Sequence, residues 1–379
     1  MKITIVGPAH PYRGGLASIM QSMAREFSSR GDTVDIKTFK LQYPSFLFPG
    51  KSQTVDTEAP ADLNITRCIN TINPFNWIRI GHKIRRERPD FVLLKYWTPF
   101  MAPCFGTIAR IARRNGHTRV ICQIDNVEPH ESHIIDRPCN YYFLRSVDGY
   151  VYMSEQVNKE LKSYTKAPAI FSPHPMFENF GTRVERDHAC HKLELDPNTQ
   201  YAMFFGLIRG YKGLDMLLEA WAKLKREGKT QGRKLIVAGE FYSSKERYLS
   251  QIKSCEIEQD VILHGHFIAD DMIKYYFSAV DFVVLPYHTA SQSGVTQIAY
   301  NFSLPMIVTN VGGLPEIVPN DKVGYVCNPS FSDIASAIER AWSNDNLERF
   351  RNNLIEERKR FSWAEMCNKL TEVYNMVKK

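Results

Sequence analysis

The sequence is poor in the patterns that mark metal sites, disulfides and membrane spans. Its eight cysteines are scattered and form no Cys-x-x-Cys pair, so neither a zinc module nor a disulfide framework is predicted. The uncharged run at residues 97–109 is shorter than the ~18 residues that cross a bilayer and contains two prolines. The sequence therefore predicts no bound metal and no transmembrane helix, and the cysteine usage favours a reducing cytoplasm.

Two common nucleotide-binding signatures are also missing. The segment Pro49-Gly50-Lys51-Ser52 resembles the end of a P-loop, but Ser45 stands where the first glycine is required, which excludes a P-loop NTPase. The first strand-to-helix turn has no Gly-x-Gly-x-x-Gly, which argues against a dehydrogenase.

Charge and the amino terminus give weaker information. The chain has 48 basic and 41 acidic residues, a net charge of +7 that is compatible with anionic substrates or lipids. No nucleic-acid recognition fold or base-stacking platform is visible, so nucleic acid is not an expected partner. Residues 1–6 run directly into Gly7-Pro8 and read as a short buried strand, not a signal peptide. We expect a cytoplasmic protein.

Short apolar runs alternate with helical patterns along the whole chain, which predicts an α/β protein with two Rossmann-like parallel sheets. A polar segment, residues 178–200, separates the two sets of strands and is interpreted as a hinge, and the cleft between the domains as the active site. Residues 362–377 predict a final amphipathic helix. The predicted strands are residues 3–6, 34–39, 91–94, 120–124 and 150–153, then 202–205, 235–238, 261–263, 282–285 and 306–309.

The most informative segment is residues 204–221. An apolar strand ends in a glycine turn that places Arg209 and Lys212 before the start of a helix, an arrangement that suits a diphosphate leaving group. This segment resembles the nucleotide-sugar transferases of glycosyltransferase family 4. That family usually has its arginine at the position of Leu207, two residues before Arg209.

The resemblance extends over the chain and implies the GT-B fold. It implies an acceptor domain at residues 1–175, a nucleotide-sugar donor domain at residues 176–352, and residues 353–379 returning to the first domain. Residues 305–318 are similar to the family's strand and Gly-Gly-x-x-Glu segment, which makes Glu316 a donor-site candidate. The family's pair of glutamates, with seven residues between them, has no counterpart near Ser291 and Ala299.

Several further residues are candidates for the donor site. Glycines at the start of the first helix allow the backbone to approach a phosphate closely, and small residues that open a later helix leave its first amides free to hold an anion. A third segment is the candidate base pocket, which does not distinguish uridine from guanosine. These candidates are Gly14 and Gly15; Ser293, Gly294 and Val295; and Gly265 and Phe267.

Polar residues that follow the strand at 120–124 are candidates for contact with the sugar or the acceptor. Asp125 is a catalytic candidate, and Asn126 and His130 are acceptor candidates, because ligands collect at the carboxyl edge of a parallel sheet. Residues 76–88 combine arginines with apolar side chains, and Arg110, Arg113 and Arg114 form a second basic cluster. Such clusters suit an anionic membrane surface, with a solvated helix face as the alternative.

Taken together, the resemblance implies a retaining glycosyltransferase of bacterial polysaccharide or glycan assembly. It would move a sugar from a UDP- or GDP-linked donor to a glycan or polyprenyl-linked acceptor, without a cofactor. Two alternatives stay open. The missing glutamate pair allows a catalytically silent nucleotide-sugar-binding or scaffold protein, and GT-B architecture also allows a nucleotide-sugar epimerase.

Overall fold

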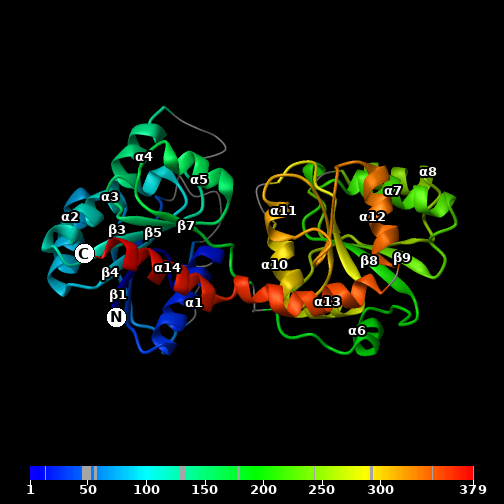
Figure 1. The fold of residues 1–379 in the computed structure, drawn as a ribbon, viewed down its shortest axis with the longest axis horizontal. Helices are drawn as coiled ribbons and strands as arrows, with labels where there is room; N and C mark the ends of the chain where they lie inside the picture. Colours follow the sequence, from blue (N-terminus) through cyan, green and yellow to red (C-terminus); the bar gives the residue numbers. More distant parts are fainter. Residues whose placement is uncertain are drawn as a thin grey trace. The chain divides into compact units, whose positions relative to one another are not determined.

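The computed structural model describes residues 1–12, 14–44, 53–54, 58–128, 134–176, 180–242, 244–290, 293–343 and 345–378. The chain divides into two compact units. The first contains residues 1–174 and 363–379, and the second contains residues 175–362. Each is an α/β unit built on one parallel sheet (Figure 1). The predicted fold class is confirmed.

The sheet of the first unit has the strand order β3-β2-β1-β4-β5-β6-β7. Its central strands are buried on both faces, which explains why they read as continuous apolar runs. The strands are β1 (Lys2–Val6), β2 (Thr33–Leu41), β3 (Ile65–Asn70), β4 (Phe91–Tyr96), β5 (Arg119–Ile124), β6 (Gly149–Tyr152) and β7 (Ala169–Phe171).

Helices cover both faces of this sheet. One face packs against α1 (Gly15–Ser29) and α14 (Trp363–Val377), and the other against α2 (Pro74–Glu87), α3 (Ala102–Ala112), α4 (Asp136–Leu144) and α5 (Glu155–Lys162). Short 3-10 turns, η2 (Pro99–Met101) and η3 (Arg113–Asn115), flank α3.

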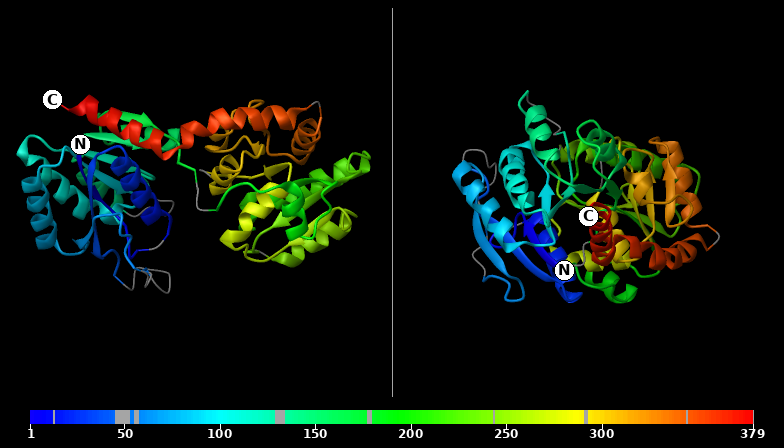
Figure 2. Two further views of the ribbon diagram at one scale, coloured as in Figure 1. Left: turned by 90° about the horizontal axis from the view of Figure 1, so that it is seen from below. Right: turned by 60° about the vertical axis from the view of Figure 1, so that its left-hand side comes forward.

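The helix α14 is an integral part of the first unit although it lies 189 residues beyond His174 in the sequence. Its buried face includes Met366, Leu370 and Val373, which join the same apolar cluster as β1, β4 and β5. Arg119 at the start of β5 donates from Nε to the carbonyl oxygen of Val377, 2.9 Å away. Figure 2 shows α14 lying along the first sheet. The helix therefore completes one layer of the unit.

The second unit has the strand order β10-β9-β8-β11-β12-β13, again parallel. The strands are β8 (Gln200–Phe205), β9 (Arg233–Ala238), β10 (Val261–His264), β11 (Phe282–Leu285), β12 (Met306–Thr309) and β13 (Gly324–Cys327). The helices are α6 (Arg186–Lys192), α7 (Leu214–Arg226), α8 (Lys245–Ser254), α9 (Asp270–Ala279), α10 (Gly294–Asn301), α11 (Leu314–Ile317), α12 (Phe331–Ala341) and α13 (Asn346–Glu357), with 3-10 turns η4 (Gly210–Lys212) and η5 (Arg358–Phe361).

The interpretation of residues 178–200 as a hinge is wrong. Most of this segment belongs to the second unit, where Ala189, Cys190 and Leu193 are buried in the core beside α9. The guanidinium of Arg186 donates to the carboxylate of Asp281 at 3.0 Å. Four of the few apolar residues of the segment, namely Ala189, Cys190, Leu193 and Leu195, are buried, so a low apolar content did not mean exposure. The chain passes between the units at residues 174–175 and 362–363.

Candidate functional site

The carboxyl ends of the strands in the second unit bring together the loops that were predicted to bind phosphate. After β8 the chain turns at Gly206 (φ 99°), and Gly213 (φ 69°) precedes α7. A Cβ atom on Gly213 would lie 1.8 Å from the carbonyl oxygen of Pro286. Only glycine fits a left-handed backbone in such close contact. The loops after β8 and β11 are therefore packed directly on each other.

Lys212 belongs to the loop after β8, at the end of the 3-10 turn η4. Its Nζ is 3.4 Å from the position that a Cβ atom on Gly206 would take, and Val295 Cγ2 is 3.5 Å from the same position. Nζ also lies 5.7 Å from the centre of the Tyr287 ring. The ammonium group thus sits close to the first turn of α10.

The surroundings of Lys212 disfavour its charge. Burial, followed by the nearby cation of Arg209, lowers the pKa of the ammonium from 10.5 to about 8. No carboxylate among the described residues forms an ion pair with it. A half-buried cation without a counter-ion, next to helix amides, is a site prepared for an anion.

The first turn of α10 is held by its N-cap. Ser293 accepts a hydrogen bond from the amide of Val295 at 3.3 Å, and its hydroxyl lies 3.0 Å from the hydroxyl of Tyr287. Tyr287 is almost fully buried, and burial raises the pKa of its hydroxyl to about 12. The tyrosine therefore fixes the serine, and the serine orients the start of the helix. The positive end of α10 faces the same space as Lys212.

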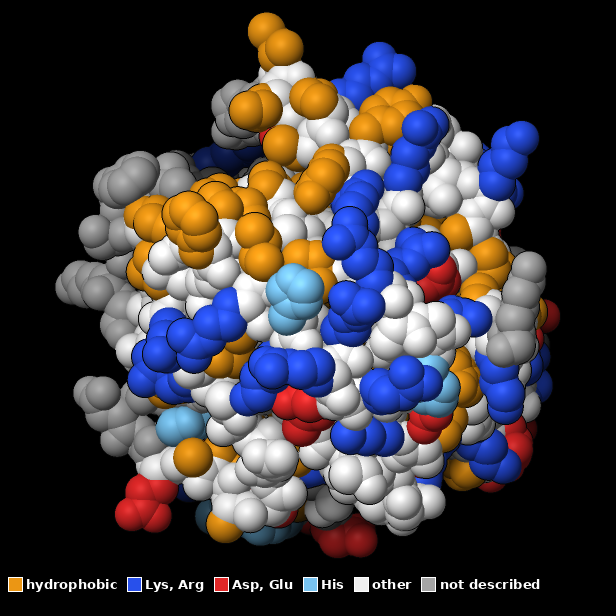
Figure 3. Space-filling model, turned by 90° about the vertical axis from the view of Figure 1, so that its left-hand side faces the viewer, with side chains coloured by type: hydrophobic (Ala, Val, Ile, Leu, Met, Phe, Trp, Pro, Cys, Tyr) orange, Lys and Arg blue, Asp and Glu red, His pale blue; other side chains and the backbone are white. Residues whose placement is uncertain are grey.

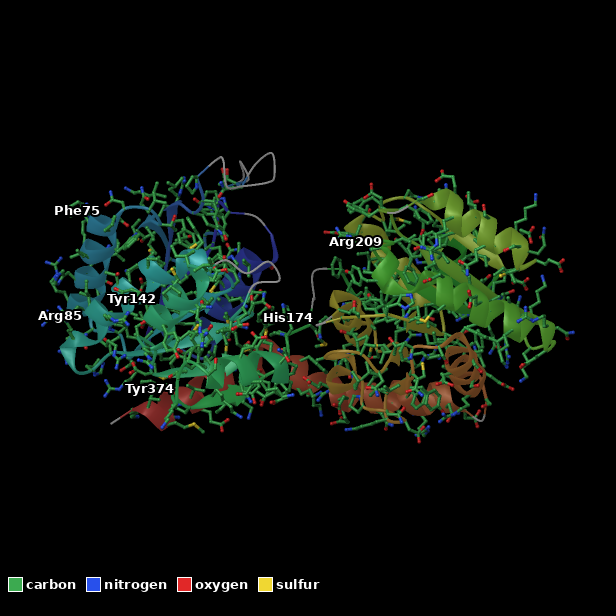
Figure 4. All side chains as sticks on the ribbon, turned by 90° about the horizontal axis from the view of Figure 1, so that it is seen from above. Phe75, Arg85, Tyr142, His174, Arg209 and Tyr374 are labelled. Carbon is green, nitrogen blue, oxygen red and sulfur yellow. The ribbon has the colours of Figure 1, made fainter. Side chains whose placement is uncertain are left out.

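Arg209 occupies a more open position than Lys212. Its side chain is exposed, and its guanidinium carbon lies 5.1 Å from the centre of the Tyr242 ring (Figure 4). The neighbouring Ile208 is fully buried and pairs with Phe241 after β9. A buried isoleucine thus anchors the turn, and the arginine is left free to reach a ligand at the carboxyl edge.

The remaining donor-site candidates occupy separate loops of the second unit. Gly265 follows β10 and packs against the Phe241 ring, which a Cβ atom would approach to 2.7 Å. Phe267 is 66% exposed. Glu316 lies in the four-residue α11 after β12, and its carbonyl oxygen accepts from Arg360 at 3.0 Å. All three follow strands of the same sheet, but no described contact joins them to Lys212.

In the first unit, Asp125 directly follows β5. Its Oδ1 is 2.5 Å from Nζ of Lys95, a fully buried residue of β4. Asn126 is exposed, and His130 lies outside the described residues. Gly14 (φ 97°) is the N-cap of α1, and Gly15 begins that helix. Neither glycine has an atom within 4 Å of an added Cβ, so both leave open space at the helix start.

Two residues of these sites were missed in the sequence. Tyr287 comes two residues after β11, a position where ligand-contacting residues are common, so its place in the chain was a usable signal. Lys95 was missed because it interrupts an otherwise apolar strand, where a lysine is unexpected. Its partner is distant in sequence and becomes visible only when β4 and β5 pair.

Within the part of the chain that the structure describes, no group of three or more His, Cys, Asp or Glu side chains is placed to hold a metal ion. No helix in the described ranges has both the length and the apolar character needed to span a bilayer.

Comparison with known proteins gives a consistent result. A family model described as glycosyl transferases group 1 matches residues 199–344. The O-antigen chain mannosyltransferase C of Escherichia coli is 23% identical over 370 residues, covering 95% of this chain and 93% of that protein. The D-inositol 3-phosphate glycosyltransferase of Pseudarthrobacter chlorophenolicus is 27% identical over 166 residues, a match that spans 44% of this chain but only 38% of the relative.

A likeness in structure extends over the whole chain. HepE of Anabaena, solved in complex with UDP, has a TM-score of 0.69 and 14% sequence identity, and the match covers 99% of this chain and 100% of that one. At this identity the likeness establishes a shared fold.

Proposed function

We propose that this chain, which has the GT-B fold, is a glycosyltransferase that transfers a sugar from a UDP- or GDP-linked donor to a glycan or lipid-linked glycan acceptor. The proposed setting is bacterial polysaccharide or glycan assembly, and the proposed outcome is retention of the anomeric configuration. The likeness to an O-antigen mannosyltransferase supports a glycan acceptor, and the UDP bound to HepE supports a nucleotide-linked donor.

The observation that carries this proposal is the Lys212 ammonium beside the first turn of α10, which pairs with no carboxylate of the described residues. As the glycosidic bond breaks, the diphosphate leaving group gains negative charge. Lys212, Arg209 and the amides at Ser293–Val295 would stabilise that charge more than they stabilise the intact donor, which is how fixed positive groups accelerate a reaction. The acceptor hydroxyl attacks the sugar carbon on the face that the diphosphate leaves, and a donor phosphate oxygen takes the hydroxyl proton.

The proposed reaction needs no metal ion and no cofactor beyond the nucleotide sugar, since the fixed cations meet the charge of the diphosphate. Asp125 and Asn126 are proposed to contact hydroxyl groups of the sugar or the acceptor. Transfer should therefore continue at an unchanged rate in the presence of excess EDTA, and a strict requirement for Mg²⁺ or Mn²⁺ would refute this part of the proposal.

The first test is a thermal-unfolding screen of the purified protein with UDP, GDP, ADP and their sugar conjugates. A ligand at 100 times its dissociation constant stabilises by about 2.7 kcal/mol, which gives a clear shift. The selected donor is then supplied with glycan acceptors, and Lys212→Ala should lower turnover by roughly 100-fold. Lys253→Ala, an exposed lysine of α8, is the matched control. Near-normal turnover in Lys212→Ala would refute the assignment.

The missing glutamate pair favours one competing function, a nucleotide-sugar-binding protein without transferase activity. The family position of one glutamate is Ala299, which is fully buried in α10 and offers no polar group to a ligand. Selective donor binding with neither transfer nor hydrolysis would favour this second function. Conversion of the donor sugar without an acceptor would indicate an epimerase.

We further propose that the protein works in the cytoplasm at the inner face of the plasma membrane, where lipid-linked acceptors are found. A surface of the first unit supports this (Figure 3). On α2, Phe75 is 84% and Ile78 is 43% exposed, and the basic residues of the same helix include Arg79, Arg85 and Arg86 (Figure 4). Apolar and basic side chains together suit an anionic bilayer.

Flotation with liposomes tests this membrane proposal. Binding should require anionic lipid and should fall at least severalfold in Phe75→Ser, because that change removes the most exposed aromatic side chain of α2. Phe331→Ser, which alters an exposed phenylalanine of the second unit, is the control. Equal recovery with neutral and anionic liposomes would refute the membrane proposal and leave the transferase proposal intact.

A further inference from the structure

One feature of the first unit is not explained by packing. Lys95 of β4 is fully buried, and it lies on the sheet face that α1 and α14 cover, next to Gly7 and Met20. Taking an ammonium group out of water is costly unless a counter-ion and hydrogen bonds replace the water. A buried lysine on a strand of this kind therefore needs a structural or functional reason.

The counter-ion of Lys95 is Asp125, at the carboxyl end of the neighbouring strand. The distance between Nζ and Oδ1 is 2.5 Å. The aspartate is also held by its backbone amide, which donates to the carbonyl oxygen of Tyr96 at 2.9 Å. Its side chain is 18% exposed, and Oδ2 accepts a hydrogen bond from none of the described residues. Lys95 thus fixes the carboxylate through Oδ1, and Oδ2 stays available to a ligand at the edge of the sheet.

The second buried lysine of the same sheet shows a different arrangement. Lys37 of β2 is 3% exposed and pairs with two carboxylates, Asp35 Oδ2 at 2.7 Å and Glu87 Oε2 at 2.9 Å. The other oxygen of Asp35 accepts from the hydroxyl of Thr4 at 2.7 Å. This network joins β1, β2 and α2, and both oxygens of its aspartate are used within it.

We propose that Lys95 is a positioning residue that holds the carboxylate of Asp125 so that Oδ2 accepts a hydrogen bond from a sugar hydroxyl during transfer. The inference deepens the proposed function and rests on it. Three observations carry it: among the described residues Lys95 has one counter-ion, Asp125 lies at the edge where β1, β4 and β5 end, and its second oxygen has no hydrogen-bond donor from that part of the chain. A hydroxyl is the expected partner because an ionised carboxylate only accepts hydrogen bonds.

The test compares the kinetics of Lys95→Met, Lys95→Arg, Asp125→Asn and the double variant Lys95→Met/Asp125→Asn. In Lys95→Met, kcat should fall about 10- to 100-fold, which is the cost of a reacting group displaced by about 1 Å, and KM for the donor should change less than threefold. Lys95→Arg should restore part of kcat, since it keeps the charge. The double variant should be no slower than Asp125→Asn alone, because the two residues act as one unit.

Lys37→Met is the matched control, since it removes the other buried lysine of the sheet. It should lower the unfolding temperature at least as much as Lys95→Met and leave kcat within about twofold of the wild type. A kcat in Lys95→Met within twofold of the wild type would overturn the proposal, and so would an equal loss of kcat in Lys37→Met.

Failure of the proposed function gives a different result. In that case the wild type itself transfers no sugar from any donor that it binds. Coupling between Lys95 and Asp125 is then still measurable from the unfolding temperatures of the single and double variants, and additive effects would show that the pair is not a unit.

Discussion

Replacing Lys212 with methionine should stabilise the empty protein and weaken its binding of a nucleoside diphosphate. Methionine fills nearly the same volume and removes the charge. The two effects have one cause, because the ammonium lies in a half-buried position that disfavours its charge until an anion arrives. A residue that serves packing alone would show the opposite effect on stability.

The shifted pKa of Lys212 gives the magnitude. A fall from 10.5 to about 8, caused first by burial and then by Arg209, corresponds to about 3 kcal/mol against the charged form at about 1.4 kcal/mol per unit. Because the side chain keeps some contact with water, we reduce the expected gain in the variant to about 1–2 kcal/mol. For a unit of this size, that gain corresponds to a rise of about 2–8 °C in Tm.

The effect has a defined dependence on pH. Between pH 8 and pH 10.5 the unfolded chain still carries the proton on Lys212 while the folded chain has lost it, so the wild type gains stability as the pH rises through this range. The advantage of the variant is therefore fully present below about pH 8 and disappears near pH 10.5. Affinity of the wild type for the diphosphate should fall over the same range, since the ammonium is its binding form.

Thermal unfolding of the wild type and Lys212→Met at pH 7 and pH 9, with and without the selected nucleotide, measures both effects. The nucleotide should shift Tm at least severalfold less in the variant. Lys253→Met should change neither quantity. A variant that is less stable than the wild type without nucleotide, or one that keeps the full nucleotide shift, would refute the reasoning.

Three further outcomes follow from the contacts. Asp125→Asn should lower the free energy of unfolding by about 3 kcal/mol, because it leaves the buried Lys95 ammonium without its counter-ion. In urea unfolding it should destabilise the protein more than Lys95→Met does, and the reverse order would contradict the burial argument. Gly213→Ala should destabilise the folded protein by at least about 2 kcal/mol more than Gly228→Ala. Both glycines have φ near 70°, but only Gly213 has a carbonyl oxygen within 2 Å of an added Cβ. Equal Tm values of the two variants would exclude this clash. Tyr287→Phe should lower the free energy of unfolding by about 1 kcal/mol and weaken nucleotide binding severalfold, because it removes the hydroxyl that supports the N-cap of α10. Unchanged binding in a calorimetric titration would show that the tyrosine hydroxyl does not contribute to the site.

Most of the strands that the sequence predicted are buried ones. Residues 282–285 and 306–309 were predicted to the residue, because a strand covered on both faces is a continuous apolar run between polar residues. Three of the four edge strands, β3, β7 and β13, were missed, and the fourth, β10, was predicted because its first three residues are apolar. β3 contains Asn and Arg as well as Ile, and β7 has three residues. At the edge of a sheet the apolar signal weakens since one side meets fewer neighbours.

The residues of the candidate site also fall into two groups, those that a local sequence pattern indicates and those that depend on contacts between distant parts of the chain. Lys212 and Ser293 belong to short loops between a strand and a helix, so the local pattern indicated them and the structure places them near each other. The pair Lys95 and Asp125 depends on contact between residues that are distant in sequence. Their roles in binding and transfer stay predictions until the variants are measured.

The place of α14 in the first unit sets an order of events during synthesis of the chain. Residues 1–174 leave the ribosome first, but part of one face of their sheet, including Ile121 and Val151, lacks the cover of α14 until residues 363–377 have been made. At about 5–20 residues per second, that interval lasts roughly 10–40 s. The second unit is one continuous segment and is complete before the first. The nascent chain therefore carries an exposed apolar surface for much of its synthesis, and chaperones should bind it at this stage.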